Sequence, residues 1–381
     1  MATLRGNALS LLLPFQVFRA VTNEPLITGP LLYILTRGPV HIRERILEPF
    51  RKNLLAKNGA SRITTTIAIL KVYFIIGVLR RFNQVMNRIA LNGWALRRQG
   101  EPFVFGPTKQ ELVVITGGSS GFGYEMVKAF SNLARVVVFD VNDLPPELET
   151  LPGVHFYRLD ISKFKKVEEA CADVKRVHGD PTVLINNAGI ANKKSILETT
   201  NEETDRLFQI NIIAHFTLIR EFVPAMLRMR KGHVVTIASM ASFVAGEGLV
   251  DYSCTKTGAL FLNDGEFPSG LPHNDCSQPS GLRRELQRIY VGGEAICTTS
   301  VHPSWYQTGI LAGAEEALAK RGIKPRPPVE VSDAVVEQVL KARSGRLVVP
   351  AGAEMWTSIR TWPLWLQDMV SGLGRRNTLK Q

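Results

Sequence analysis

The sequence predicts an α/β fold: a doubly wound parallel sheet with an apolar, basic helical extension at the N-terminus. From residue 111 onward, short runs of Val and Ile alternate with segments long enough for helices. Such alternation is typical of a parallel sheet covered by helices on both faces. The runs are mostly apolar, as in strands buried on both sides. A glycine-rich turn, T-G-G-S-S-G-F-G (116–123), directly follows the first run.

Seven apolar runs are predicted to be the strands of this sheet, in chain order. Segments such as Tyr124–Ala134 and Glu202–Met229 lie between them and are predicted to be helices. The predicted strands are Leu112–Ile115, Val136–Phe139, Val154–Arg158, Val183–Ile185, His233–Ile237, Ile296–Val301 and Leu347–Val349.

Residues 1–110 lack this rhythm and are expected to form a membrane-associating extension. They carry 16 Lys and Arg against 4 Glu, which accounts for the whole net charge of +12. The basic residues are interleaved with long apolar stretches, which nucleic-acid-binding arms usually lack. The expected partner is therefore a membrane surface with anionic lipids, and not a nucleic acid.

The most apolar stretch of this extension is Ile63–Leu79, which is flanked by Arg62 and by Arg80-Arg81. As a helix it reaches about 25 Å, short of the ~30 Å hydrocarbon core of a bilayer. Lys71 near its middle adds a further cost, which snorkelling partly relieves. A helix inserted in or lying on a membrane is favoured, and a buried helix packed on the rest of the chain is the alternative.

The tail from Met355 to Gln381 contains three of the five tryptophans of the chain and the pair Arg375-Arg376. Tryptophan beside basic residues favours a membrane–water interface, whereas packing against the core or a dimer mate is the alternative. Four widely spaced cysteines form no C-x-x-C pair, which fits a reducing, intracellular compartment. The expected domains are a membrane-associating extension (1–110), a dinucleotide-binding domain (111–350) and a Trp-rich tail (351–381).

The run 116–123 has the arrangement of a dinucleotide-binding (Rossmann) turn. Gly117 permits the tight turn, Gly121 lets the backbone approach a pyrophosphate, and Gly123 permits close packing of helix on strand. The N–H groups and the dipole of the following helix face the phosphates. Asp140 ends the second strand, where a carboxylate binds ribose hydroxyls and repels a 2′-phosphate, so NAD is predicted rather than NADP. Asp140 opening an ordinary loop is the alternative.

Three motifs in this order resemble the short-chain dehydrogenase/reductase superfamily over about residues 110–350. They are T-G-x-x-x-G-x-G from Thr116, then Asn186-Asn187-Ala188-Gly189, then Tyr252-x-x-x-Lys256. The segment 184–216 and the N-terminal extension look closest to the membrane-associated retinol and 17β-hydroxysteroid dehydrogenase-like subgroup. The resemblance implies an oxidoreductase that interconverts a lipophilic alcohol (retinoid, steroid or fatty alcohol) and its carbonyl. It also implies a homodimer, and a location at the endoplasmic reticulum or lipid droplets.

Tyr252 and Lys256 are four residues apart, so they share one face of a helix, about 6 Å apart. A phenol titrates near pH ~10, and a nearby cation favours its ionised form. Tyr252 is therefore predicted to be the acid/base group. By the resemblance, Lys256 also holds the nicotinamide ribose, and Ser239, thirteen residues before the tyrosine, hydrogen-bonds the substrate oxygen. Ser242 is the alternative to Ser239, and either serine could instead cap a helix.

Asn211 matches the asparagine that, in the family, holds a water on a proton path to the lysine. A buried helical asparagine needs a partner, so either a water or a backbone kink would fit. The resemblance also assigns Asp160 to the adenine edge, Asn187 to the adenosine ribose and Thr308 to the carboxamide end, with capping or loop roles as alternatives. The predicted cofactor-binding residues are Thr116, Gly117, Ser119, Gly121, Phe122, Gly123, Asp140, Asp160, Asn187, Ala188, Gly189, Tyr252, Lys256 and Thr308.

No metal is predicted, because the histidines form no H-x-x-x-H pattern and no cluster with carboxylates. Two departures from the family pattern stand out. Pro303-Ser304 replaces the usual Pro-Gly, and the helix after Lys256 is interrupted by 265–281, which contains three prolines. Proline costs ~3 kcal/mol inside a helix, so an insertion near 266–280 must loop out or end the helix. The insertion gives a second hypothesis: a non-catalytic, membrane-bound dinucleotide-binding or scaffold protein whose pocket is disrupted.

Overall fold

The computed structural model describes residues 24–54, 59–264, 281–313, 315–320 and 322–372. The chain divides into two compact units, Met1–Ala90 and Leu91–Gln381. The division into 1–110, 111–350 and 351–381 stays a prediction. The insertion at 266–280 and the pair Arg375-Arg376 lie outside the described residues.

The described part of the N-terminal unit is helical. Gly29 lets one helix approach another closely, because a Cβ at this position would lie 3.0 Å from the ring of Phe74. Glu24 accepts a hydrogen bond from Arg81 Nε at 3.1 Å, which ties the start of the first helix to the long third helix. The three helices are α2 (Pro25–Arg37), α3 (Val40–Leu54) and α4 (Gly59–Leu91).

Two helical segments of the described chain are long and apolar enough to cross a membrane, and they differ in burial. Only 6% of the most apolar window of Ile63–Leu91 is buried, and side chains such as Val72, Ile75 and Phe82 are exposed. In Asn201–Met229 the buried share is 67%, as expected for a core helix of a folded domain. Of these two segments, the one with a largely exposed apolar surface is therefore α4.

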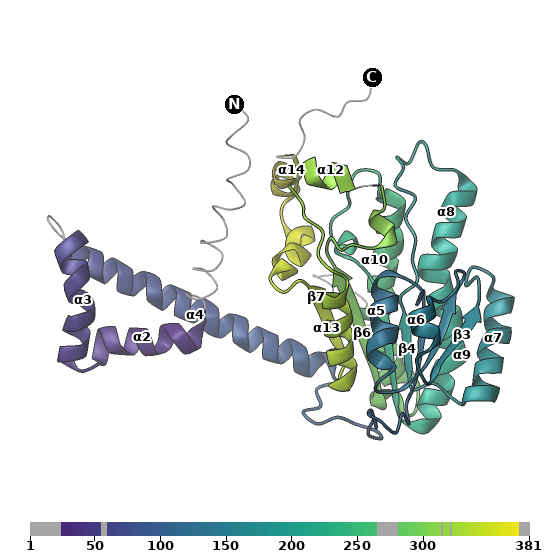
Figure 1. Cartoon of the computed structure of the whole chain (residues 1–381). Coiled ribbons are helices and arrows are strands. Elements are labelled where there is room, and N and C mark those ends of the chain that lie inside the picture. The colour runs from purple at the N-terminus through teal and green to yellow at the C-terminus, as the bar shows by residue number, and fades with distance from the viewer. Residues whose placement is uncertain (1–23, 55–58, 265–280, 314, 321, 373–381) are drawn as a thin grey trace. The chain divides into compact units, whose positions relative to one another are not determined.

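The second unit contains a seven-stranded parallel sheet with the strand order β3-β2-β1-β4-β5-β6-β7 (Figure 1). The predicted fold class and all seven predicted strands are confirmed. β1 pairs with β2 on one side and with β4 on the other, so the strand order reverses at β1. Ligands of open α/β sheets bind at such a reversal, outside the carboxyl ends of the strands. The strands are β1 (Leu112–Thr116), β2 (Arg135–Asp140), β3 (Val154–Arg158), β4 (Val183–Asn186), β5 (Gly232–Ile237), β6 (Ile296–Pro303) and β7 (Gly345–Val349).

Helices cover both faces of the sheet, because the strand residues are apolar on both sides. One core contains Phe130 of α5 and Val335 of α13, and the other contains Val167 of α7 and Phe222 of α9. Burial of each such side chain contributes about 1.5–3 kcal/mol. The helices of this unit are α5 (Gly121–Phe130), α6 (Pro146–Glu149), α7 (Phe164–His178), α8 (Asn201–Phe208), α9 (Ala214–Met229), α10 (Val250–Asp264), α11 (Leu282–Ile289), α12 (Glu315–Lys320), α13 (Val329–Leu340) and α14 (Leu364–Gly372).

Two predicted helices differ from the observed ones. The helix predicted at Tyr124–Ala134 begins earlier, at Gly121, because the chain becomes helical inside the glycine turn. The helix predicted at Glu202–Met229 is divided by η1 (Gln209–Ile213), one turn of π-helix between α8 and α9. Such π-turns are frequent at functional sites, and this one contains Asn211.

Candidate active site

The glycine turn brings three backbone segments into contact at the end of β1. Gly117 has φ +70°, and a Cβ there would lie 2.8 Å from Ala188 Cα. Gly121 has φ +55°, and its Cβ position is 3.3 Å from the side chain of Thr308. A Cβ at Gly123 would lie 1.9 Å from the carbonyl oxygen of Gly117, so no other residue fits there without moving the turn.

Asn187 and Thr116 hold this turn against the loop that follows β4. Asn187 Nδ2 donates to the carbonyl oxygens of Thr116 and Gly117 at 2.8 and 3.0 Å. Thr116 Oγ1 accepts from the backbone N–H groups of Asn187 and Ala188, both at 3.0 Å. The first and second sequence motifs are therefore one hydrogen-bonded structure.

Asp140 lies at the end of β2 with both carboxylate oxygens engaged. Oδ2 accepts from the N–H of Ser119 at 2.9 Å, and Oδ1 accepts from the N–H of Asn142 at 3.0 Å. Ser119 Oγ donates to the carbonyl oxygen of Asn142 at 3.1 Å. The carboxylate is thus fixed beside the glycine turn, and each oxygen can accept a further hydrogen bond from a ribose hydroxyl.

Asp160, two residues after β3, also has a restrained carboxylate. Oδ1 accepts from the N–H of Ser162 at 3.0 Å. Burial raises the pKa of Asp160, but the hydrogen bonds from Ser162 and the charges of Lys163 and Arg206 outweigh burial and lower it. Asp160 is therefore ionised at neutral pH.

A cavity of about 340 Å³ lies over these strand ends. Its size and its backbone donors suit part of a dinucleotide. Two cations that the sequence reasoning missed, Lys193 and Arg206, also line it, whereas Thr116, Ser119 and Gly123 lie outside its lining. The predicted cofactor residues that line the cavity are Gly117, Gly121, Phe122, Asp140, Asp160, Asn187, Ala188, Gly189 and Thr308.

The first turns of α10 place Tyr252 and Lys256 beside the end of β5. Both side chains are buried, with 8% and 2% of their surface exposed. Lys256 Nζ lies 5.6 Å from the centroid of the Tyr252 ring and donates to the carbonyl oxygen of Ile237 at 2.8 Å. The predicted shared helical face is thus observed.

The two serines near this pair have different surroundings. Ser239 caps the short helix η2 (Met240–Ser242), where its Oγ accepts from the N–H of Ala241 at 3.1 Å, and its hydroxyl group acts to lower the pKa of the Tyr252 phenol. Ser242 Oγ is buried and donates to the carbonyl oxygen of Lys256 at 2.7 Å. Ser239 therefore caps η2 and influences the acidity of the phenol, and Ser242 supports the helix.

The pKa values of the pair move in opposite directions. Burial raises the pKa of Tyr252 to about 12, and the hydrogen bond from Ser239 opposes this increase. Burial lowers the pKa of Lys256 from 10.5 to about 8. In the protein alone, burial outweighs the expected effect of the ammonium group on the phenol. The phenol therefore stays neutral in the absence of a further positive charge.

Asn211 is fully buried in η1 and pairs with the loop after β4. Its Oδ1 accepts from the N–H of Ile190, and its Nδ2 donates to the carbonyl oxygen of Ile190, both at 2.9 Å. Nδ2 also donates to Thr255 Oγ1 at 3.1 Å, and Thr255 Oγ1 donates to the carbonyl oxygen of Tyr252 at 2.8 Å. Asn211 thus connects the loop to α10. The π-turn that contains it is a backbone kink, one of the two features that the sequence predicts beside a buried helical asparagine.

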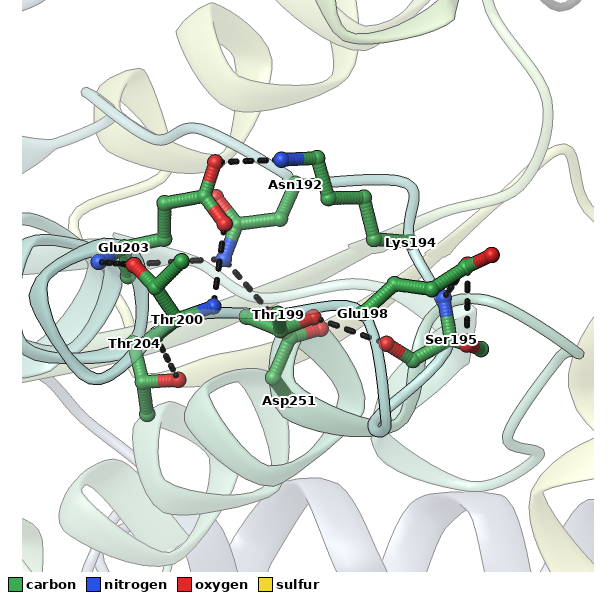
Figure 2. Close-up of polar contacts among 9 residues, drawn as sticks. All are labelled: Asn192, Lys194, Ser195, Glu198, Thr199, Thr200, Glu203, Thr204 and Asp251. Carbon is green, nitrogen blue, oxygen red and sulfur yellow. Dashed lines mark hydrogen bonds and ion pairs between the residues drawn. The ribbon is translucent and has the colours of Figure 1, made fainter.

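Gly189 brings the two halves of the site together. A Cβ at this position would lie 3.4 Å from both Asn211 Oδ1 and Lys256 Nζ. A second link, between Asn192 and Asp251, lies three residues further along the same loop (Figure 2). The sequence reasoning missed Asn192, Asp251 and Thr255, because no pattern joins polar residues so far apart in the chain. Among the described residues no group of His, Cys, Asp or Glu could hold a metal ion.

Part of the chain is similar to known dehydrogenases. Residues 111–264 match the short chain dehydrogenase family model. The chain is 37% identical over 158 residues to "Dehydrogenase RED2" of Cochliobolus heterostrophus, a match that covers 41% of this chain and 59% of the relative. It is 34% identical over 211 residues to "Epidermal retinol dehydrogenase 2" of Mus musculus, covering 53% and 62%. It is 28% identical over 215 residues to "Estradiol 17-beta-dehydrogenase 11" of Pongo abelii, covering 55% and 66%.

The chain thus spans about three fifths to two thirds of the length of these relatives. A solved structure, "4-hydroxyisoleucine dehydrogenase complexed with NADH", has a TM-score of 0.54 at 19% identity, and the match covers 65% of this chain and 99% of that one. At this level of identity the likeness confirms the fold.

Proposed function

Since this chain belongs to the short-chain dehydrogenase/reductase superfamily, we propose that it interconverts a lipophilic alcohol and its carbonyl with NAD(H). The observation that carries the proposal is the buried pair Tyr252 and Lys256, whose ammonium group lies beside Gly189 of the loop after β4. The names of the similar retinol and estradiol dehydrogenases support a retinoid, steroid or fatty alcohol as the substrate.

In this proposal, Gly121, Asp140 and Thr308 would help to hold NAD, which would supply the hydride acceptor and a positive ring that favours the phenolate. Tyr252 takes the hydroxyl proton of the alcohol at its phenol oxygen, or gives it back in the reverse direction. Ser239 orients the substrate oxygen. Lys256 favours the phenolate when it is charged, and with a pKa of about 8 it can also release a proton near neutral pH. Asn211 supports proton exchange by holding the loop and helix around this lysine.

NAD is the proposed cofactor because Asp140 lies at the end of β2, fixed by two backbone donors. A carboxylate there binds ribose hydroxyls and repels a 2′-phosphate. The cations Lys193 and Arg206 line the same cavity, and they are the observation that favours NADP as the alternative. Comparing the affinities of the protein for NADH and NADPH decides between them.

The proposed location is an intracellular membrane, of the endoplasmic reticulum or of lipid droplets. The open apolar surface of α4 supports it. Exposed Leu364 and Trp365 of α14 and Trp356 support a second interfacial contact, as tryptophan favours the membrane–water boundary. A homodimer, and spanning or interfacial insertion of α4, belong to the same proposal. A carbonate wash of isolated membranes tests it, because a peripheral protein is released and an inserted one is retained.

The catalytic assignment is tested with Tyr252→Phe, which keeps the ring and removes the hydroxyl. General acid–base catalysis contributes about 10²- to 10⁴-fold, so turnover of retinoid, steroid or fatty alcohols is expected to fall by about that factor. NADH affinity, measured by fluorescence titration, is expected to change less than about twofold. The matched control is Tyr290→Phe, at a tyrosine with 45% of its surface exposed. Full turnover by the Tyr252 variant would refute the assignment.

A second candidate is a dinucleotide-binding protein without catalysis. The favouring observation is that the cavity is lined by predicted cofactor residues, whereas Ser239, Asn211, Tyr252 and Lys256 are not among its lining. Tight NADH binding without turnover of any alcohol or carbonyl in the panel would support this candidate. Repeating the assay after deletion of 266–280 tests the hypothesis that the insertion blocks catalysis: recovery of turnover would support it.

A further inference from the structure

We propose that Asn192 and Asp251 form a clamp that couples the cofactor loop to the catalytic helix and so positions Tyr252. The inference rests on the proposed function for its kinetic consequences. Both are positioning residues, because they act on the site through the elements that they join. The clamp is the contact of Asn192 Nδ2, which donates to Asp251 Oδ2 at 2.7 Å (Figure 2).

Asp251 contacts both the loop, through Asn192, and the backbone of Tyr252. Its second oxygen, Oδ1, accepts from the backbone N–H of Tyr252 at 2.7 Å. This N–H lies in the first turn of α10, where backbone donors have no partner within the helix. The carboxylate of Asp251 therefore binds the loop with one oxygen and the backbone N–H of Tyr252 with the other.

Asn192 belongs to the same short loop as the residues that line the cavity. The loop leaves β4 through Asn187 and Gly189, is fixed at Ile190 by Asn211, and reaches Asn192 two residues later. Asn192 Nδ2 also lies 3.4 Å from the carbonyl oxygen of Glu203 in α8. The side chain thus sits where the loop, α8 and α10 meet (Figure 2).

The clamp and Asn211 fix the loop to α10 at two points. Asn211 reaches α10 through Thr255, whose hydroxyl donates to the carbonyl oxygen of Tyr252. The clamp reaches the N–H of the same tyrosine through Asp251. The backbone of Tyr252 is therefore held on both sides by contacts that begin at Ile190 and Asn192. A cofactor that orders the loop thereby also orders the tyrosine.

The kinetic test compares the single variant Asn192→Asp with the double variant in which the side chains of residues 192 and 251 are exchanged. Asn192→Asp places two carboxylates opposite each other, and a displacement of about 1 Å at a reacting group costs on the order of 10²-fold in rate. We expect kcat to fall by about 10- to 100-fold, with a smaller change in KM. Combining Asn192→Asp with Asp251→Asn restores one donor facing one acceptor, and kcat is expected to recover to within about threefold of the native value.

The matched control is Lys194→Ala. Lys194 lies in the same loop and pairs with Glu203 at 2.6 Å, but this pair does not involve α10. Its kcat is expected to be native. If the exchange fails to rescue kcat while thermal stability is native, or if Lys194→Ala loses as much as Asn192→Asp, the clamp is not a positioning device.

A second readout does not depend on turnover. Hydrogen–deuterium exchange of the peptide that contains 250–256 is measured with and without NADH. We expect NADH to slow exchange there in the native protein and in Lys194→Ala, and not in Asn192→Ala, even when NADH is saturating. Equal protection in Asn192→Ala would overturn the proposal. If the native protein shows this protection but no turnover, the proposed function is refuted and the clamp is not.

Discussion

Gly117 and Gly123 shape the proposed cofactor half of the site through their backbone, whereas Tyr252 and Lys256 form the proposed catalytic half through buried side chains. In the first half the constraint is steric, since a Cβ would collide with a neighbouring backbone atom at 2.8 or 1.9 Å. In the second half the constraint is electrostatic, since burial raises the pKa of Tyr252 to about 12 and lowers the pKa of Lys256 to about 8. A side chain at Gly117 or Gly123 therefore does not fit in the cofactor half. In the catalytic half, burial makes the charged form of Lys256 energetically costly.

The largest effect is expected from Gly123→Ala, which tests the steric side of this comparison. The new methyl group would overlap the carbonyl oxygen of Gly117 and approach Asn187 Nδ2, so the turn must move. We expect NADH affinity to fall by about 100-fold, equivalent to ~2.7 kcal/mol, measured by fluorescence titration. Gly246→Ala is the control, because the nearest atom to its Cβ position lies 3.4 Å away. Native affinity in the Gly123 variant would show that the turn is not rigid.

Lys256→Met tests the electrostatic side. The pKa of Lys256 falls from 10.5 to about 8 on folding, so the unfolded chain binds this proton more tightly and folding stability rises as pH increases from 8 to 10.5. Below pH 8 the buried charge of Lys256 therefore lowers folding stability by about 3 kcal/mol. Removing the lysine also removes its hydrogen bond to Ile237, which offsets ~1 kcal/mol of the gain in stability. The variant is expected to be inactive but more stable at pH 7, and to lose this advantage near pH 10.

The measurement is thermal unfolding in detergent at the two pH values, with Lys341→Met as the control. Lys341 forms an exposed helical ion pair with Glu337 at 2.7 Å, so its removal is expected to change stability little at either pH. A Lys256 variant that is less stable than the native protein at both pH values would show that the buried ammonium group stabilises the fold.

Asp140→Asn makes a smaller change and tests whether charge also matters in the cofactor half. The amide keeps an oxygen acceptor for one backbone donor and removes the negative charge. The ratio of NADPH to NADH affinity is expected to rise about tenfold, or ~1.4 kcal/mol. Asp143→Asn, at a nearby exposed aspartate, should leave the ratio unchanged. A native protein that already prefers NADPH would contradict the role given to Asp140.

The smallest effect is expected from Thr200→Ala, at the capping box of α8. Thr200 Oγ1 accepts from the N–H of Glu203 at 3.2 Å, and Glu203 Oε2 accepts from the N–H of Thr200 at 3.1 Å. Loss of such a cap typically costs ~1 kcal/mol of stability. Because Thr200 is not among the residues that line the cofactor cavity, kcat and NADH affinity should remain within about twofold. A larger loss of kcat would extend the catalytic half to this helix.

The fold could be predicted from the sequence because its signals are local. Each strand is a mostly apolar run, and β1 to β7 differ from the predictions by no more than two residues at either end. The glycine turn is equally local, since eight consecutive residues specify it. The boundaries of α5 and the division at η1 were not predicted, because the helical pattern of side chains continues through both.

The sequence by itself determined the residue types and their spacing: a glycine turn after a strand, a carboxylate after the next, and a tyrosine four residues before a lysine on one helical face. The tertiary structure alone decided which neighbours these groups have and therefore how acidic they are. Asn192 and Asp251 are 59 residues apart in the chain yet form a hydrogen bond, and only folding buries Lys256 enough to change its pKa. The reason is physical: backbone periodicity is local, whereas burial and long-range hydrogen bonds depend on the whole folded chain.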